Sequence, residues 1–137
     1  MNRRNLISKL ILSAGVLFLG SRTVSAKPKS LPKGVFIHHV FFWMKDPMNM
    51  EDRRNLEAGL TKLSSIDLIK TRHIGIPANT NRDVIERTYQ YSILFTFKNK
   101  ADQDIYQSHP DHLKFVDECS HLWKQVTVFD TVDIGSV

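Results

Sequence analysis

The segment that most constrains the fold is VFIHHVFFW, residues 35–43, because it is apolar on both of its faces. It consists mostly of β-branched and aromatic residues, a composition typical of a buried β-strand. Side chains alternate along a strand, so one face carries Val35, Ile37, His39, Phe41 and Trp43. The other face carries Phe36, His38, Val40 and Phe42. Helices normally cover one such face, and the other face then needs a second apolar partner.

The rest of the chain alternates between helical and strand patterns. Residues 46–66 have a helical period, with Asn49 as a plausible N-cap and a leucine stripe opposite the charges. Residues 66–78 and 88–97 have strand character, and the polar segment between them is predicted to be a loop. Residues 99–108 and 110–123 are predicted to be helical, and residues 126–134 close the chain with a strand.

The resulting order is β-α-β-β-α-β, with the second helix broken at Pro110. This order predicts an α+β, ferredoxin-like antiparallel sheet with its helices on one face. The opposite face would carry apolar side chains that nothing in the chain covers, and such a patch usually marks an interface. We therefore expect a two-fold homodimer formed through the sheet face.

Residues 1–26 are predicted to be an export signal. A basic start precedes the apolar run LILSAGVLFLG, which is too short to span a bilayer, and Val24 to Ala26 form a small-residue cleavage site. Arg3 and Arg4 fit a twin-arginine signal and a general secretory signal equally, and a retained N-terminal anchor is the alternative. We expect a periplasmic or secreted protein without a stable membrane anchor, with a linker at 27–34 and one domain at 35–134.

The net charge of +5 belongs mostly to this leader. Residues 27–137 contain 15 basic and 14 acidic side chains and no basic block, so we expect no nucleic-acid partner. Cys119 is the only cysteine, which excludes an intrachain disulfide. Its place in an apolar helical pattern predicts a buried, unreactive thiol.

The stretch YQSHPDHLKF, residues 106–115, carries the candidate chemistry. Pro110 should end one helix at His109 and begin the next, which places His112 in a first helical turn. The helix N-terminus should lower the pKa of His112, whereas Asp111 should raise it. No HExxH motif or cysteine pair accompanies the histidines, so we expect no metal site. Tyr106 and His112 are either an acid/base pair or parts of a helix junction beside a pocket for an apolar ligand, or for none.

Three segments carry a resemblance to a known family: FIHHVFFWMKD at 36–46, YSILFTFKNKADQDIYQSHPDHLKFV at 91–116 and LWKQVTVFD at 122–130. On these segments the chain resembles the stress-responsive A/B barrel (Dabb) family of dimeric α+β barrels. Most members are uncharacterised, and related barrels include small monooxygenases.

A plant member of this family closes a linear polyketide by aldol condensation without a metal or cofactor. The resemblance to it implies that Tyr106 and His112 are catalytic and that His39 lies in the pocket. Tyr91 stands where that enzyme has a pocket histidine, so we expect it to contact the ligand. The resemblance thus implies a cofactor-independent cyclase or lyase acting on a carbonyl or polyketide-like compound. A non-catalytic protein that binds a small apolar ligand is the alternative.

Overall fold

The computed structural model describes residues 26–135, so the predicted export signal lies almost entirely outside the described residues. Four strands form one sheet: β1 (Phe36–Met44), β2 (Ile69–Gly75), β3 (Tyr91–Phe97) and β4 (Trp123–Thr131). The described residues also form three α-helices and one 3₁₀ turn: α1 (Met50–Leu63), α2 (Lys100–Gln107), α3 (Pro110–Cys119) and η1 (Ser120–Leu122). No helix within residues 26–135 is long and apolar enough to cross a bilayer.

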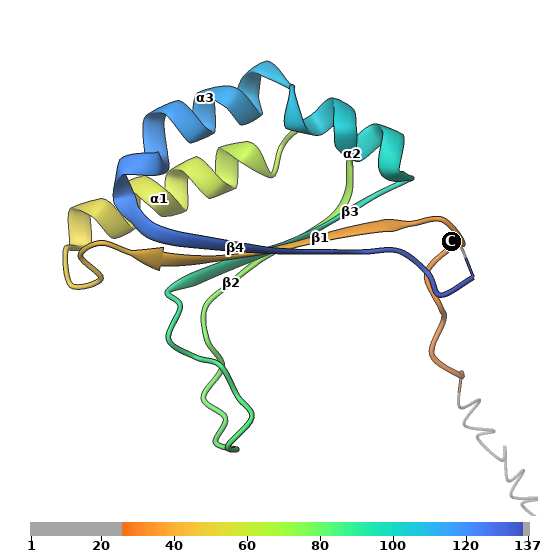
Figure 1. The fold of residues 1–137 in the computed structure, drawn as a ribbon, viewed down its shortest axis with the longest axis horizontal. Helices are drawn as coiled ribbons and strands as arrows, with labels where there is room; N and C mark the ends of the chain where they lie inside the picture. Colours follow the sequence, from red (N-terminus) through yellow and green to blue (C-terminus); the bar gives the residue numbers. More distant parts are fainter. Residues whose placement is uncertain (1–25, 136–137) are drawn as a thin grey trace, which may run out of the picture.

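The strand order is β2-β3-β1-β4 and every neighbouring pair is antiparallel. All three helices lie on one side of the sheet, which gives two layers (Figure 1). The predicted ferredoxin-like α+β fold is confirmed. Several boundaries differ: β2 and β3 are shorter than predicted, and the last predicted helix ends at Cys119, so that Trp123 already begins β4. The 3₁₀ turn between them tightens the chain so that Trp123 can pair with Met44.

Helix α1 begins at Asn49 as predicted, because its side-chain oxygen accepts hydrogen bonds from the backbone amides of Glu51 and Asp52. Its buried face consists of Leu56, Leu60 and Leu63. Helix α3 approaches α1 closely at Gly59, where an added Cβ would lie 2.6 Å from the sulfur of Cys119. Cys119 is buried, as predicted, and its burial raises the pKa of the thiol.

The two faces of β1 have different surroundings. Phe36, His38, Val40, Phe42 and Met44 point toward the helices and are buried. The alternate side chains point to the face without helices, which we call the outer face. There Phe41 contacts three aromatic rings, those of His39, Tyr89 and Phe129 at 4.2, 4.8 and 5.9 Å between centroids.

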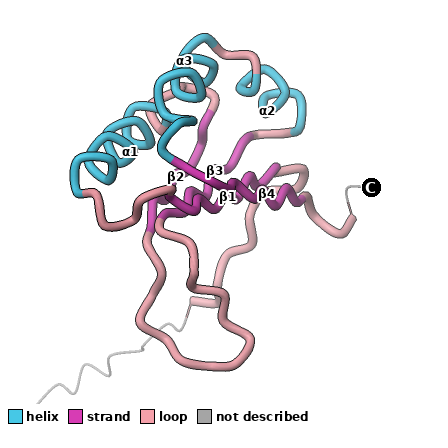
Figure 2. The backbone as a smooth tube through the Cα atoms, turned by 60° about the vertical axis from the view of Figure 1, so that its left-hand side comes forward, coloured by secondary structure: helices cyan, strands magenta, loops and turns pink. Residues whose placement is uncertain are grey.

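The outer face remains partly open, since Phe129 is 57% exposed. The loop between β2 and β3 extends from this side of the sheet, away from the helices (Figure 2). Its end is tied to β1, where the side chain of Gln90 accepts a hydrogen bond from the amide of Met44 at 2.8 Å. Trp43 donates from its indole nitrogen to the hydroxyl of Thr88 at 2.8 Å.

Candidate functional site

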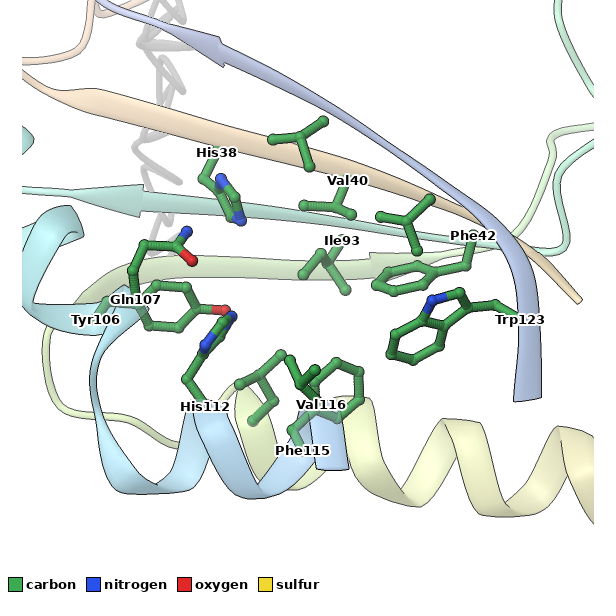
Figure 3. A pocket seen from close by; sticks show the side chains of 13 residues that line it. His38, Val40, Phe42, Ile93, Tyr106, Gln107, His112, Phe115, Val116 and Trp123 are labelled. Carbon is green, nitrogen blue, oxygen red and sulfur yellow. The ribbon is translucent and has the colours of Figure 1, made fainter. Parts of the chain in front are cut away.

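A hollow of about 120 Å³ lies between the sheet and helices α2 and α3 (Figure 3). It opens beside β4, the edge strand that the helices leave largely exposed. Three polar rings, those of His38, Tyr106 and His112, point into it. Most of the remaining wall is apolar and includes Val40, Phe42, Ile93, Phe115, Val126 and Val128.

The break between α2 and α3 brings Tyr106 and His112 together. His109 is the N-cap of α3, with its Nδ1 accepting a hydrogen bond from the amide of Asp111 at 3.1 Å, and Pro110 follows at the first helical position. This is the predicted helix stop and start. Tyr106 therefore lies in the last turn of α2 and His112 in the first turn of α3, and their ring centroids are 4.7 Å apart.

Two polar atoms of this pair are buried without a hydrogen-bond partner. They are the hydroxyl oxygen of Tyr106 and the Nδ1 of His112. An unsatisfied buried donor or acceptor costs about 1–3 kcal/mol, so native proteins keep few of them. Both atoms can hydrogen-bond to a polar group that enters the hollow. The arrangement is therefore suited to holding one polar atom of a ligand in an otherwise apolar site.

His38 is the functional candidate that the sequence reasoning missed. It is 4% exposed, and its ring lies 5.8 Å from that of Tyr106. Its Nδ1 lies 2.6 Å from a carboxylate oxygen of Asp130 on the neighbouring strand β4. Because a carboxylate only accepts, Nδ1 carries a proton, and in the uncharged ring the other nitrogen has the lone pair. The carboxylate can also stabilise a positive charge on this ring.

Burial changes the proton affinity of the other two rings. Desolvation lowers the pKa of His112, and the nearby His38 and His109 act in the same direction, against a hydrogen bond with the backbone of Gln107. Desolvation also raises the pKa of the Tyr106 hydroxyl well above its usual value. At neutral pH His112 is therefore an uncharged imidazole and Tyr106 an uncharged hydroxyl, and both can donate hydrogen bonds.

The structure places His39 away from this hollow, on the outer face, which corrects the expectation that it shares a cavity with Tyr106 and His112. Strand alternation allows only one of the two adjacent histidines to face the helices, and the pairing of β1 with β3 and β4 selects His38. Burial, together with His73 and His38, lowers the pKa of His39.

Tyr91 faces the helices but lies outside the residues that line the hollow. Its hydroxyl donates to the carboxylate of Glu57 on α1, and the guanidinium of Arg53 lies 5.1 Å from the centre of its ring. Burial and Glu57 raise the pKa of Tyr91 to about 12. This environment gives Tyr91 a packing role between β3 and α1, and its predicted contact with a ligand has no support in the geometry.

Within residues 26–135, no three histidine, cysteine or carboxylate side chains are grouped so that they could hold a metal ion. In the part of the chain that the structure describes, Asp130 is the one ionic partner of the pocket histidines, and it binds His38.

The family model described as the stress responsive A/B barrel domain matches residues 36–133. Among solved structures, the chain is similar to a Dabb family protein with a ferredoxin-like fold from Mesorhizobium loti. The two are 24% identical over 75% of this chain and 100% of that one, with a TM-score of 0.62.

It is also similar to a dimeric ferredoxin-like protein of unknown function from Thermobifida fusca. The identity is 15% over 79% of this chain and 99% of that one, with a TM-score of 0.60. A hydroxynitrile lyase from Passiflora edulis is 19% identical over 77% of this chain and 99% of that one, with a TM-score of 0.62. At these identities the similarity shows a common fold. No curated protein matches the chain.

Proposed function

The chain belongs to the stress responsive A/B barrel domain family, and we propose that it is an enzyme that transfers protons on a small carbonyl compound without a cofactor. The observation that carries this proposal is the pair of buried, unpartnered polar atoms on Tyr106 and His112 beside a histidine held by a carboxylate. Folding leaves these atoms unsatisfied at a cost in stability, and a substrate oxygen is the group that would satisfy both.

In this proposal His38 is the base. Its free ring nitrogen takes the proton from the carbon next to the carbonyl, and Asp130 stabilises the imidazolium that forms, as carboxylates do in catalytic triads. The electron pair of the broken C–H bond moves onto the carbonyl oxygen, which becomes an enolate. Tyr106 donates a hydrogen bond to this oxygen, and His112 donates a second one from Nδ1 in the tautomer that gives up its hydrogen bond with the backbone of Gln107. Return of the proton from His38 to the carbon completes an exchange cycle. In an aldol reaction the enolate carbon instead attacks a second carbonyl, and His38 gives its proton to the alkoxide that forms.

The role of His112 differs here from the general base suggested by the sequence. Burial lowers the pKa of its ring, and among the described residues no carboxylate forms an ion pair with it that would stabilise a proton taken from substrate. A neutral imidazole that donates a hydrogen bond to a developing oxyanion fits these surroundings better. His38, with Asp130 at 2.6 Å, has the stabilising partner that a base needs.

The size of the hollow favours a small reacting group. Its volume of about 120 Å³ is below the roughly 150 Å³ of a protein cavity that holds benzene. A small ketone such as butanone fits such a space, and larger substrates, including 2,4-pentanedione, would extend past Val126 and Val128. Cleavage of a hydroxynitrile, the reaction named for the structurally similar Passiflora edulis protein, uses the same parts: a base for the hydroxyl proton and donors near the oxygen.

The test is hydrogen–deuterium exchange of 2,4-pentanedione and butanone in D2O, followed by proton NMR, with acetone cyanohydrin cleavage as a second reaction. We expect the natural chain to catalyse exchange. The rate of catalysed exchange should fall at least about a hundredfold in Tyr106→Phe and in His38→Gln. His121→Gln, an exposed histidine outside the hollow, is the matched control and should keep full activity. Absence of exchange or cleavage across the panel would instead favour the alternative of a non-catalytic ligand-binding protein.

We also propose that two copies associate through the outer face. The support is its aromatic cluster around Phe41 and the dimeric state of structurally similar proteins from Thermobifida fusca and Bacteroides fragilis. Phe41→Asp should give a monomer in sedimentation, and Lys45→Asp, at an exposed position after β1, should not. Dimerisation of both variants would contradict this assignment.

Export of the chain by residues 1–26 is a further proposal, supported by the basic start, the apolar run and the small residues before Lys27. N-terminal sequencing of the protein from cell fractions tests it. A mature chain that starts at Lys27 outside the cytoplasm is expected, and an intact leader on cytoplasmic protein would refute it.

A further inference from the structure

A second and larger hollow lies at the end of the sheet where β1 begins and β3 ends. Its volume is about 640 Å³, within the range of roughly 300–1,000 Å³ that small-molecule sites occupy. It shares no residue with the hollow around Tyr106 and His112. Its walls come from the lead-in to β1, the start of β2 and the end of β3.

Three lysines converge on this hollow from three separate segments. Lys33 precedes β1, Lys70 lies in β2 and Lys98 follows β3. Among the described residues none of the three forms an ion pair. Like charges that the fold brings to one place repel one another, which disfavours the folded state. A bound anion would add an attraction to all three lysines that offsets this repulsion.

The wall beside these lysines is apolar and held in place by a turn. Leu31, 48% exposed, and Val35 supply apolar surface. The amide of Val35 donates to the carbonyl of Pro32 at 3.4 Å, and Gly34 has a φ of 79°, the value that the third residue of a type II turn requires. The amide of Gly34 also donates to a carboxylate oxygen of Asp133 at 2.6 Å, which ties the turn to the end of β4.

The polar side chains at the base of the hollow already form hydrogen bonds within the protein. The hydroxyls of Thr71 and Thr96 hydrogen-bond to each other at 2.7 Å, and the side-chain oxygen of Asn99 accepts from the amide of Asp102 at 2.9 Å. Each of these three side-chain oxygens therefore already has a hydrogen-bond partner. A ligand would find its charge complement in the lysines and an apolar wall in Leu31 and Val35.

We propose that this hollow is a binding site for an amphiphilic monoanion, namely a carboxylate attached to an apolar chain or ring. The carboxylate lies among Lys33, Lys70 and Lys98, and the apolar part lies along Leu31 and Val35. The volume accommodates a chain of about ten carbons. A ligand of this size can contact the lysines with its carboxylate and Leu31 and Val35 with its apolar chain at the same time.

The experiment is isothermal titration calorimetry of the purified protein with sodium decanoate below its micelle concentration. We expect one saturable site per chain, with affinity that falls as sodium chloride is raised. Lys33→Gln, Lys70→Gln and Lys98→Gln should each weaken binding about two- to fivefold, and the triple variant at least tenfold, as expected for partly exposed charges. Lys124→Gln, on β4 and outside the hollow, is the matched control and should bind normally.

Three outcomes would overturn the proposal: no saturable binding, equal affinity for decanol, or an equal loss in Lys124→Gln. The variant His112→Ala separates this site from the catalytic one. It should bind decanoate as the natural chain does, and loss of binding would place the anion in the smaller hollow instead. Failure of the carbonyl assays leaves this result unaffected, because the two hollows share no side chain.

Discussion

Replacing Tyr106 by phenylalanine should make the protein more stable and less active at the same time. The hydroxyl of Tyr106 is buried without a hydrogen-bond partner, so the folded state loses its hydration and gains nothing in return. Removing one unsatisfied buried group should recover about 1–2 kcal/mol of unfolding free energy. In a domain of this size that corresponds to a rise in melting temperature of roughly 4–8 °C per kcal/mol.

Tyr91→Phe is the matched control, because Tyr91 is equally buried but its hydroxyl donates to the carboxylate of Glu57. Loss of that hydrogen bond should lower the unfolding free energy by about 1 kcal/mol. Tyr91 also lies outside the hollow around Tyr106, so its variant should retain proton-exchange activity. The two tyrosine variants are therefore expected to change the unfolding free energy in opposite directions, and only Tyr106→Phe should lose activity.

The measurements are urea unfolding followed by tryptophan fluorescence, and deuterium exchange of 2,4-pentanedione on the same preparations. Suppose that Tyr106→Phe is destabilised as much as Tyr91→Phe. The hydroxyl of Tyr106 would then have a hydrogen-bond partner in the free protein. The inference that the site reserves this donor for a substrate oxygen would be refuted, even if activity were lost.

Three further predictions concern other parts of the structure. Because burial lowers the pKa of His112, the unfolded chain binds more protons below about pH 6.5, so the unfolding free energy should fall as the pH drops below that value. His112→Asn should flatten this dependence in urea titrations at pH 7.5 and 5.5, and an unchanged slope would contradict the assignment. Asn49→Ala should lower the unfolding free energy by about 0.5–2 kcal/mol through loss of the α1 cap, whereas Asn55→Ala, in the same helix, should not. Gly59→Ala should cost about 1–3 kcal/mol because its methyl group meets the sulfur of Cys119 and the ring of Phe115. Cys119→Ala in the same chain should restore part of the loss in urea unfolding, and no rescue would refute the contact with the sulfur.

The fold could be predicted from the sequence because its strongest signals are local. The doubly apolar strand β1, the leucine stripe of α1 and the break at Pro110 each specify an element, and their order specifies the ferredoxin-like topology. The position of Tyr106 and His112 on either side of that break also follows from the chemistry of proline.

The rest of the site depends on contacts between distant segments. Both faces of β1 are apolar, so alternation alone leaves open whether His38 or His39 meets the helices. The choice is made by strand pairing, which sets His38 beside Asp130, 92 residues away. One local signal does favour an inward position for His38, because it shares its face of β1 with Phe36, Val40 and Phe42. The face of His39 ends in Trp43, and the indole nitrogen of Trp43 needs a hydrogen-bond partner.

The exposed edge strand β4 has a consequence for how such proteins diversify. Val126 and Val128 line the hollow around Tyr106 and His112, yet they are 37% and 46% exposed and contribute little to the buried core. Substitutions there change the shape offered to a substrate at a small cost in folding free energy, in contrast to substitutions at Phe42 or Ile93. Natural selection can thus alter which molecules enter while the machinery of Tyr106 and its neighbours is inherited unchanged.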